Sequence, residues 1–169
     1  MLETRIAPSA DMPMKEVMDA TVISDNRVYS THHATGEVAV LDASSGRELT
    51  RFRELGKPVS LALSGASLFV LDYDGRLLTL NRDSGRVLGE VRLQGNPDRL
   101  TVMDDIAFLS DREGFVTSVR TATGKVIGRE RLEGVPMDLT PMADGHVAVA
   151  VSRRGVIVLD RNLKPLETL

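Results

Sequence analysis

A unit of about 39 residues recurs along this chain, so the chain must fold as a series of similar units. Glycines in matching contexts fall at Gly36, Gly75, Gly114 and Gly155, spaced 39, 39 and 41 residues apart. Two more registers share the period. One contains Gly46, Gly85 and Gly124, with Lys164 where a fourth glycine would fall, and the other contains Val22, Leu61, Leu100 and Leu139. Three registers with one period predict four repeats.

The second repeat is the easiest to interpret, because short β-forming runs alternate in it with turn residues. We expect strands over residues 59–63, 68–71, 77–80 and 87–93, separated by turns that contain Asp74-Gly75 and Ser84-Gly85. Glycine adopts the positive φ that tight hairpins need without a steric penalty. Each repeat is therefore predicted to be a four-stranded antiparallel meander.

The polarity of the strands predicts how the four repeats are arranged. The first three strands of a repeat are largely apolar, whereas the fourth carries charges, as in Arg129-Glu130-Arg131. Charges protect an exposed edge from pairing with another chain, so we place the fourth strand at the rim. A single apolar sheet cannot cover both its faces, but radially stacked sheets can. A paired-helix repeat is excluded, because no segment after residue 20 has ten residues of uninterrupted helical periodicity.

The predicted fold class is therefore all-β: a β-propeller of four four-stranded antiparallel blades, forming either a four-bladed ring or half of an eight-bladed ring. We expect blades over about residues 20–56, 57–95, 96–134 and 135–169, preceded by a closing strand and connector over residues 1–19. Residues 1–6 (MLETRI) resemble a fourth strand and are expected to complete the last blade. Closure within one chain gives a four-bladed ring, closure between two chains gives a homodimer with eight blades, and another protein could complete the ring instead.

Several runs resemble known propeller repeats. The run VYST at residues 28–31, with VAVLD at 38–42 and GKPV at 56–59, resembles the YVTN repeat of bacterial and archaeal propellers. The run AVLDASSGRE at residues 39–48 is similar to the blade signature of quinoprotein-like (pyrroloquinoline-quinone-type) propellers. The resemblance covers about residues 20–169 and implies a propeller fold, commonly with seven blades in the first family and eight in the second. Quinoprotein blades usually carry a Trp shortly after the glycine of this run, and the present sequence contains no Trp.

The amino-acid composition limits the classes of partner and of chemistry that we expect for this chain. The chain has 21 Lys and Arg against 24 Asp and Glu, scattered along its length, so we expect no nucleic-acid partner steered by a basic surface. It has no Cys, which excludes disulfides and thiolate chemistry. No apolar run is long enough for a membrane span. The first residues lack the apolar core of a signal peptide, so the sequence predicts a cytoplasmic chain, or an extracytoplasmic one if a leader has been trimmed.

The candidate site lies on the face that carries the turns between the second and third strands (b–c turns) and the connections between blades (d–a turns), where propellers usually bind partners. Its candidate residues are His32, His33, Asp72, Asp74, Asp111, Glu113, Arg153 and Arg154. His33, Asp72 and Asp111 lie 39 residues apart and are expected at equivalent positions around the ring. Imidazole and carboxylate groups can bind a divalent metal or act as a general base. Turn chemistry alone also favours Asp at such positions, so we interpret the set as a polar partner surface.

No nucleophile elbow or glycine-rich phosphate loop is present, and we assign no catalytic, cofactor-binding or metal residue. The sequence therefore favours a non-catalytic binding or scaffold module that engages a protein partner through the b–c/d–a face, with no cofactor. The alternative is an enzyme or ligand-binding propeller that holds a divalent metal or a small organic ligand near the central channel. A structural oligomerisation unit without a ligand is a third reading.

Overall fold

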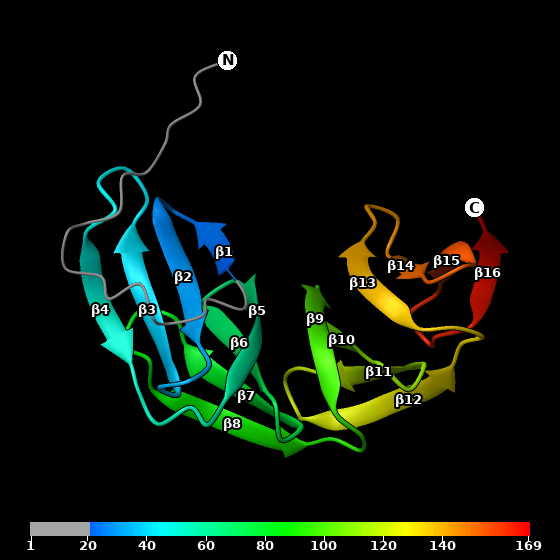
Figure 1. Ribbon diagram of the computed structural model, residues 1–169, viewed down its shortest axis with the longest axis horizontal. Helices are drawn as coiled ribbons and strands as arrows, with labels where there is room; N and C mark the ends of the chain where they lie inside the picture. The colour runs from blue at the N-terminus through cyan, green and yellow to red at the C-terminus, as the bar shows by residue number, and fades with distance from the viewer. Residues whose placement is uncertain (1–20) are drawn as a thin grey trace.

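The computed structural model describes residues 21–169, which form sixteen strands in four separate antiparallel sheets (Figure 1). The expected closing strand at residues 1–6 lies outside the described residues.

Each sheet consists of four strands consecutive in the chain, and we call these sheets blades one to four. Blade one contains β1 (Thr21–Ser24), β2 (Arg27–His32), β3 (Glu37–Asp42) and β4 (Glu48–Phe52). Blade two contains β5 (Pro58–Ser64), β6 (Ser67–Asp72), β7 (Arg76–Asn81) and β8 (Val87–Arg92). Blade three contains β9 (Pro97–Met103), β10 (Ile106–Asp111), β11 (Phe115–Arg120) and β12 (Lys125–Arg131). Blade four contains β13 (Pro136–Pro141), β14 (Val147–Val151), β15 (Gly155–Leu159) and β16 (Pro165–Thr168).

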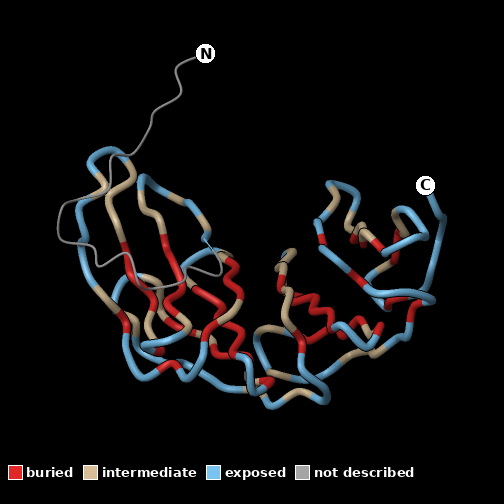
Figure 2. The backbone as a smooth tube through the Cα atoms, viewed as in Figure 1, coloured by how far each residue is buried: buried red, intermediate tan, exposed pale blue. Residues whose placement is uncertain are grey.

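The first strand of each blade lies on the concave side of the molecule and the fourth lies at the rim (Figure 1). The middle strands are the most buried, while every residue of β16 and most of β8 are exposed (Figure 2). The prediction of an all-β propeller with charged rim strands is thereby confirmed. No helix occurs in residues 21–169, and hence none there has the length and apolar character that a membrane crossing requires.

The hydrophobic core lies between blades rather than inside them. Tyr29 and Val40 of blade one pack with Leu61 and Val70 of blade two. A second cluster joins blades two and three, and a third joins blades three and four. Because strand side chains alternate between the two faces of a sheet, each blade has one face toward the preceding blade and one toward the following blade. The stability of each blade therefore depends on its neighbours.

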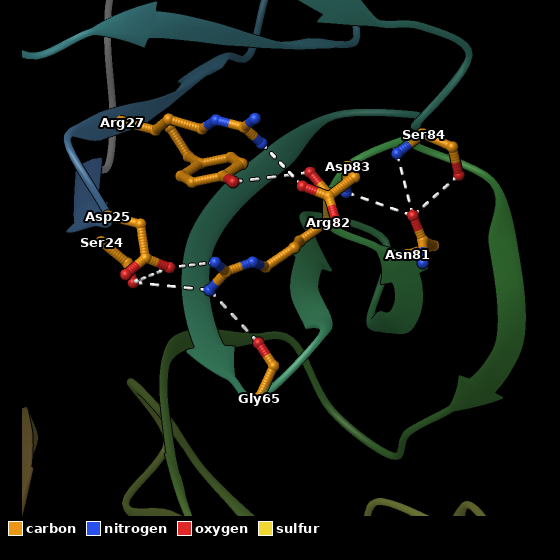
Figure 3. Close-up of polar contacts among 9 residues, drawn as sticks. Ser24, Asp25, Arg27, Gly65, Asn81, Arg82, Asp83 and Ser84 are labelled. Atoms are coloured by element: carbon orange, nitrogen blue, oxygen red, sulfur yellow. Dashed lines mark hydrogen bonds and ion pairs between the residues drawn. The ribbon is translucent and has the colours of Figure 1, made fainter.

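Polar contacts also join blades one and two, on the face opposite to the b–c turns (Figure 3). Arg82, in the turn after β7, forms an ion pair with Asp25 and donates a hydrogen bond to the Gly65 carbonyl at 3.2 Å. Arg27 pairs with Asp83 at 2.7 Å. A similar ion pair joins Arg161 of blade four to Asp104 of blade three. The turns on this face thus hold neighbouring blades together.

The four blades follow an open arc, with blade one and blade four at its two ends (Figure 1). The main contacts between blades join β1 and β2 to β5, β5 and β6 to β9, and β9 and β10 to β13, all in consecutive blades. Within residues 21–169 the main contacts between blades therefore follow the chain order along this arc.

Strand pairing corrects the predicted equivalence of Val22, Leu61, Leu100 and Leu139. Leu61, Leu100 and Leu139 pair with β-strand partners in the same register and face the preceding blade. Val22 does not belong to this set: it pairs with Tyr29 and packs toward the following blade. The reason is that the β1–β2 hairpin lies 40 residues before the β5–β6 hairpin, and the b–c turn of blade one has one extra residue that restores the spacing at Gly36.

The fourth repeat departs from the period as well. The backbone position of Gly46, Gly85 and Gly124, with φ between 68° and 70°, is taken in blade four by Leu163 (φ 68°) and not by Lys164. Gly155 pairs with Val151 at the end of the β14–β15 ladder, one residue beyond the position of Gly114. The b–c turn of blade four therefore differs from that of blade three, and its Arg153 has a positive φ of 63°.

Candidate binding face

The b–c and d–a turns lie against each other on one side of the molecule. The Leu55 amide donates to the Gly36 carbonyl at 3.0 Å, and the Tyr73 amide donates to the Lys57 carbonyl at 2.8 Å. In blade four the Ser152 amide donates to the Val135 carbonyl at 2.9 Å. These hydrogen bonds define a continuous face made of two kinds of turn, which we call the b–c/d–a face.

Asp72, at the end of β6, is fully buried and holds its own turn together. Its carboxylate accepts hydrogen bonds from the amides of Asp74 at 3.0 Å and Arg76 at 2.9 Å, and from the Arg76 guanidinium at 2.7 Å. The carboxylate oxygens are thus occupied by donors within the same turn. Asp72 therefore acts as a structural residue, while Asp74 next to it is exposed.

Asp111 repeats this arrangement in blade three. It is 3% exposed and accepts hydrogen bonds from the amides of Glu113 and Phe115, each at 2.9 Å. The Arg129 guanidinium lies 3.6 Å from the Asp111 carboxylate and also 3.6 Å from the centre of the Phe115 ring. Both carboxylates therefore support turns, as the preference of Asp for such turns indicates.

The two histidines occupy different positions from those expected. His32 ends β2 as Asp72 ends β6 and Asp111 ends β10, so His32, and not His33, is the structural equivalent of the two aspartates. His32 is buried, whereas His33 lies partly exposed in the longer turn of blade one. The ring of His33 meets the ring of Tyr73 edge to face, with centroids 5.8 Å apart.

The remaining candidates are surface residues. Arg153 is exposed in the b–c turn of blade four, and Arg154 forms an ion pair with Glu133 in the preceding d–a turn. The carboxylate of Glu113 belongs to the exposed tip of its turn. Among residues 21–169, no group of three or more His, Asp and Glu side chains is arranged to hold a metal ion.

A groove of about 540 Å³ opens on the b–c/d–a face where blades two and three meet. Two of the sequence candidates, His33 and Glu113, line it, and the other six do not. The remaining lining residues are Val59, Tyr73, Asn96, Pro97, Asp98, Arg99 and Arg112. Tyr73 is 56% exposed, so its ring forms an accessible aromatic wall.

The charges of the groove are arranged around Asp98. Arg112 donates to the Asp98 carboxylate at 2.7 Å, and this hydrogen bond raises the pKa of the Arg112 guanidinium. Arg99 donates to the carbonyls of Asp98 and Met137, which fixes its side chain between blades three and four. The side chain of Arg112 is 79% exposed, so its guanidinium remains accessible to a partner. The groove thus combines an aromatic wall with an oriented cation.

The sequence offered a signal for some of the missed residues. Tyr73 is one of only two Tyr in the chain and follows directly after a strand, in a turn otherwise made of Asp and Gly. An aromatic residue at such a tip has no core to fill. Asp98 and Arg99 gave no such signal, because they belong to an inner strand, β9, and reach the groove only through the way that blade three sits beside blade two.

The fold is that of a β-propeller, as similar solved structures also show. The hydrazine synthase of Kuenenia stuttgartiensis is similar with a TM-score of 0.79 and 12% identity, over 99% of this chain and 51% of that one. The computationally designed Ika8 protein is similar with a TM-score of 0.75 and 18% identity, over 90% of this chain and 48% of that one. The designed Ika4 protein has a TM-score of 0.72 and 18% identity, over 88% of this chain and 93% of that one.

These likenesses concern the fold alone, because the identities are low. The chain spans about half the length of the Ika8 and hydrazine synthase chains. No protein-family model and no curated protein matches the sequence. The resemblance to YVTN and quinoprotein-like repeats therefore stays a prediction, while the propeller architecture is established.

Proposed function

We propose that this chain is a non-catalytic binding module, a half-ring of an eight-bladed propeller that engages a protein partner through the b–c/d–a face. The single observation that carries the proposal is the groove between blades two and three, with Tyr73 exposed on its wall and Arg112 at its rim. Tyrosine and arginine are enriched among the residues that dominate the energy of protein interfaces.

The chemistry of the carboxylates supports binding over catalysis. Asp72 and Asp111 are occupied by amide donors and by arginines, so neither presents a free base to the groove. Val59 and Pro97 give the groove an apolar part beside its charged rim. An extended peptide with an apolar side chain and an acidic neighbour fits this combination, because the apolar group would contact Tyr73 and the acid would meet Arg112.

The test selects peptides from a displayed random library on the purified protein and compares their affinities for variants. Tyr73→Ala and Arg112→Ala should each weaken the selected peptides by about 10- to 100-fold, the range expected for central interface residues. Leu88→Ala is the matched control, because Leu88 is also about half exposed but lies on the rim strand β8. Selected peptides that bind the Tyr73 and Arg112 variants as tightly as the wild type would contradict the proposal.

The same protein allows a direct comparison with the ligand-binding alternative. Thermal stabilisation by Zn²⁺, Mn²⁺ or Ca²⁺ that disappears in His33→Ala would favour a metal or small-ligand site, since only a ligand that binds the folded state raises the melting temperature. A binding module for peptides is expected to show no such shift.

A further inference from the structure

Two of the three internal junctions of the arc follow one packing rule. A residue near the end of the rim strand lies over a positive-φ glycine in the turn between the third and fourth strands (c–d turn) of the following blade. Phe52 of blade one fills the space next to Gly85 of blade two, where a Cβ would overlap its ring. Val91 of blade two does the same at Gly124 of blade three, with its Cγ2 2.5 Å from the position that a Cβ would take. At the third junction Leu163 of blade four stands in place of the glycine.

Blade four carries the equivalent residue, Leu169, in a largely exposed position. Phe52 pairs with Val38 and Val91 pairs with Leu77, and Leu169 exchanges both backbone hydrogen bonds with Val156 at the corresponding place. Phe52 is 6% exposed because blade two covers it, whereas Leu169 is 70% exposed. Leu169 therefore presents an apolar side chain of the kind that elsewhere is covered by the next blade.

The other end of the arc presents a matching residue. Leu63 and Val102, on the first strands of blades two and three, pair across their hairpins and pack against the preceding blade. Ile23 has the same register on β1 and is 68% exposed. Gly46 of blade one also has the φ of 70° that Gly85 shares. One end thus carries the side chain, and the other end carries the glycine on which such a side chain rests.

We propose that a second copy of this chain closes the ring, with Leu169 of each copy packed over Gly46 of the other. The inference rests on the half-ring part of the proposed function and names what completes it. Two half-rings related by a two-fold axis form two identical junctions, so both ends of both arcs are covered at once. The junctions repeat the geometry of blades one and two within a single chain, with Leu169 in the role of Phe52 and Ile23 in the role of Leu63.

The first test is the mass of the protein in solution. We expect twice the mass of the 18.4 kDa chain. Leu169→Glu and Ile23→Glu should each raise the dissociation constant of the dimer at least about tenfold, because each would bury a charge in an apolar contact. Leu166→Glu is the control: Leu166 shares the strand β16, and its counterpart Leu88 is half exposed although blade three follows it. Circular dichroism of each variant shows that it is folded.

The second test uses the absence of cysteine from the sequence. A chain with Leu169→Cys and Gly46→Cys should form disulfides between two copies, giving a covalent dimer on a non-reducing gel. Val91→Cys with Gly124→Cys is the positive control, because these residues already meet inside one chain.

The results of the two tests distinguish between the possible ways of closing the ring. If the protein has the mass of one chain and the disulfide forms within that chain, the proposal is overturned in favour of a four-bladed ring. Single-chain mass with no link between the two introduced thiols would overturn it in favour of a different partner. Peptide binding that depends on Tyr73 in a protein of single-chain mass would leave the binding face standing and reject the homodimer, so the two proposals fail separately.

Discussion

The ring of Phe52 occupies the place where a side chain on Gly85 would begin. Gly85 has a φ of 70°, a conformation that side chains disfavour, so two independent reasons require glycine there. The first is the backbone and the second is the close approach of blade one. At this junction an aromatic side chain on one blade rests on a bare backbone turn of the next.

The first prediction separates these two reasons. Gly85→Ala should lower the free energy of unfolding by about 2–4 kcal/mol, combining about 1–2 kcal/mol for the left-handed backbone with the cost of overpacking. Gly65→Ala should cost only about 1 kcal/mol, because Gly65 has a φ of 54° but nothing within 4 Å of its Cβ position. Urea unfolding measures both, and equal losses in the two variants would show that Phe52 gives way freely.

The second prediction concerns the buried carboxylate of Asp72. Asp72→Ala should lower the free energy of unfolding by about 3 kcal/mol or more, because two turn amides lose their acceptor and Arg76 loses its buried partner. Asp74→Ala should stay within about 0.5 kcal/mol, since the Asp74 side chain is exposed. If Asp72 were instead a ligand held for a partner, its removal would leave the unfolding midpoint unchanged.

The third prediction concerns Leu163, which is buried although its φ is 68°. Leu163 takes the backbone position of a glycine and fills the space near Gly128 with its own side chain. Removing the Leu163 side chain should lower the free energy of unfolding by about 2–5 kcal/mol in both variants. A glycine, unlike an alanine, relieves about 1–2 kcal/mol of strain in the left-handed backbone. We therefore expect Leu163→Gly to be at least as stable as Leu163→Ala in chemical denaturation.

Leu159 provides the comparison for Leu163. It is fully buried in the strand β15, where glycine is disfavoured. Leu159→Gly should accordingly be about 1 kcal/mol less stable than Leu159→Ala, the reverse of the order at Leu163. The same order at both positions would mean that the left-handed backbone at Leu163 carries little strain.

The sequence predicted the blades well because the signals that define a blade are local. Hairpin turns with Gly and an apolar strand beside a charged one can be recognised within a few residues of Gly75 or Gly85. Equivalence between blades was predicted less accurately. The b–c turn of blade one has one extra residue, so the structural equivalent of Asp72 in that blade is His32 and not His33. Spacing alone cannot distinguish an insertion in a turn from a shift in a strand.

The candidate site was predicted only in part for a different reason. Asp72 and Asp111 have the residue type of a site, but their oxygens are used by amides of the same turn, which only the turn geometry reveals. The groove exists because residues from three blades meet. Contacts between blades cannot be predicted from the residue pattern within a single repeat. Tyr73 could have been selected, as an aromatic residue at an exposed tip.

The fourth prediction concerns pH and Asp42, the last residue of β3, which accepts hydrogen bonds from the following turn. The hydroxyls of Ser44 and Ser45 donate to its carboxylate at 2.6 and 2.8 Å, and with the two backbone amides they lower the pKa of Asp42 from 3.8 to about 2. Because the folded pKa lies below the unfolded one, the contribution of Asp42 to stability is fully present above about pH 4 and is lost as the pH falls toward 2. An NMR titration of the carboxyl carbon should show a midpoint near pH 2 in the wild type.

Replacing both serines tests the cause. Ser44→Ala with Ser45→Ala removes the two hydroxyl donors and keeps the backbone amides, so the pKa of Asp42 should rise toward its ordinary value. In Asp42→Asn the stability should fall less steeply between about pH 4 and pH 2 than in the wild type, because no carboxylate is left to protonate at this turn. A midpoint for Asp42 that stays near pH 2 without the two hydroxyls would assign the shift to the backbone amides alone.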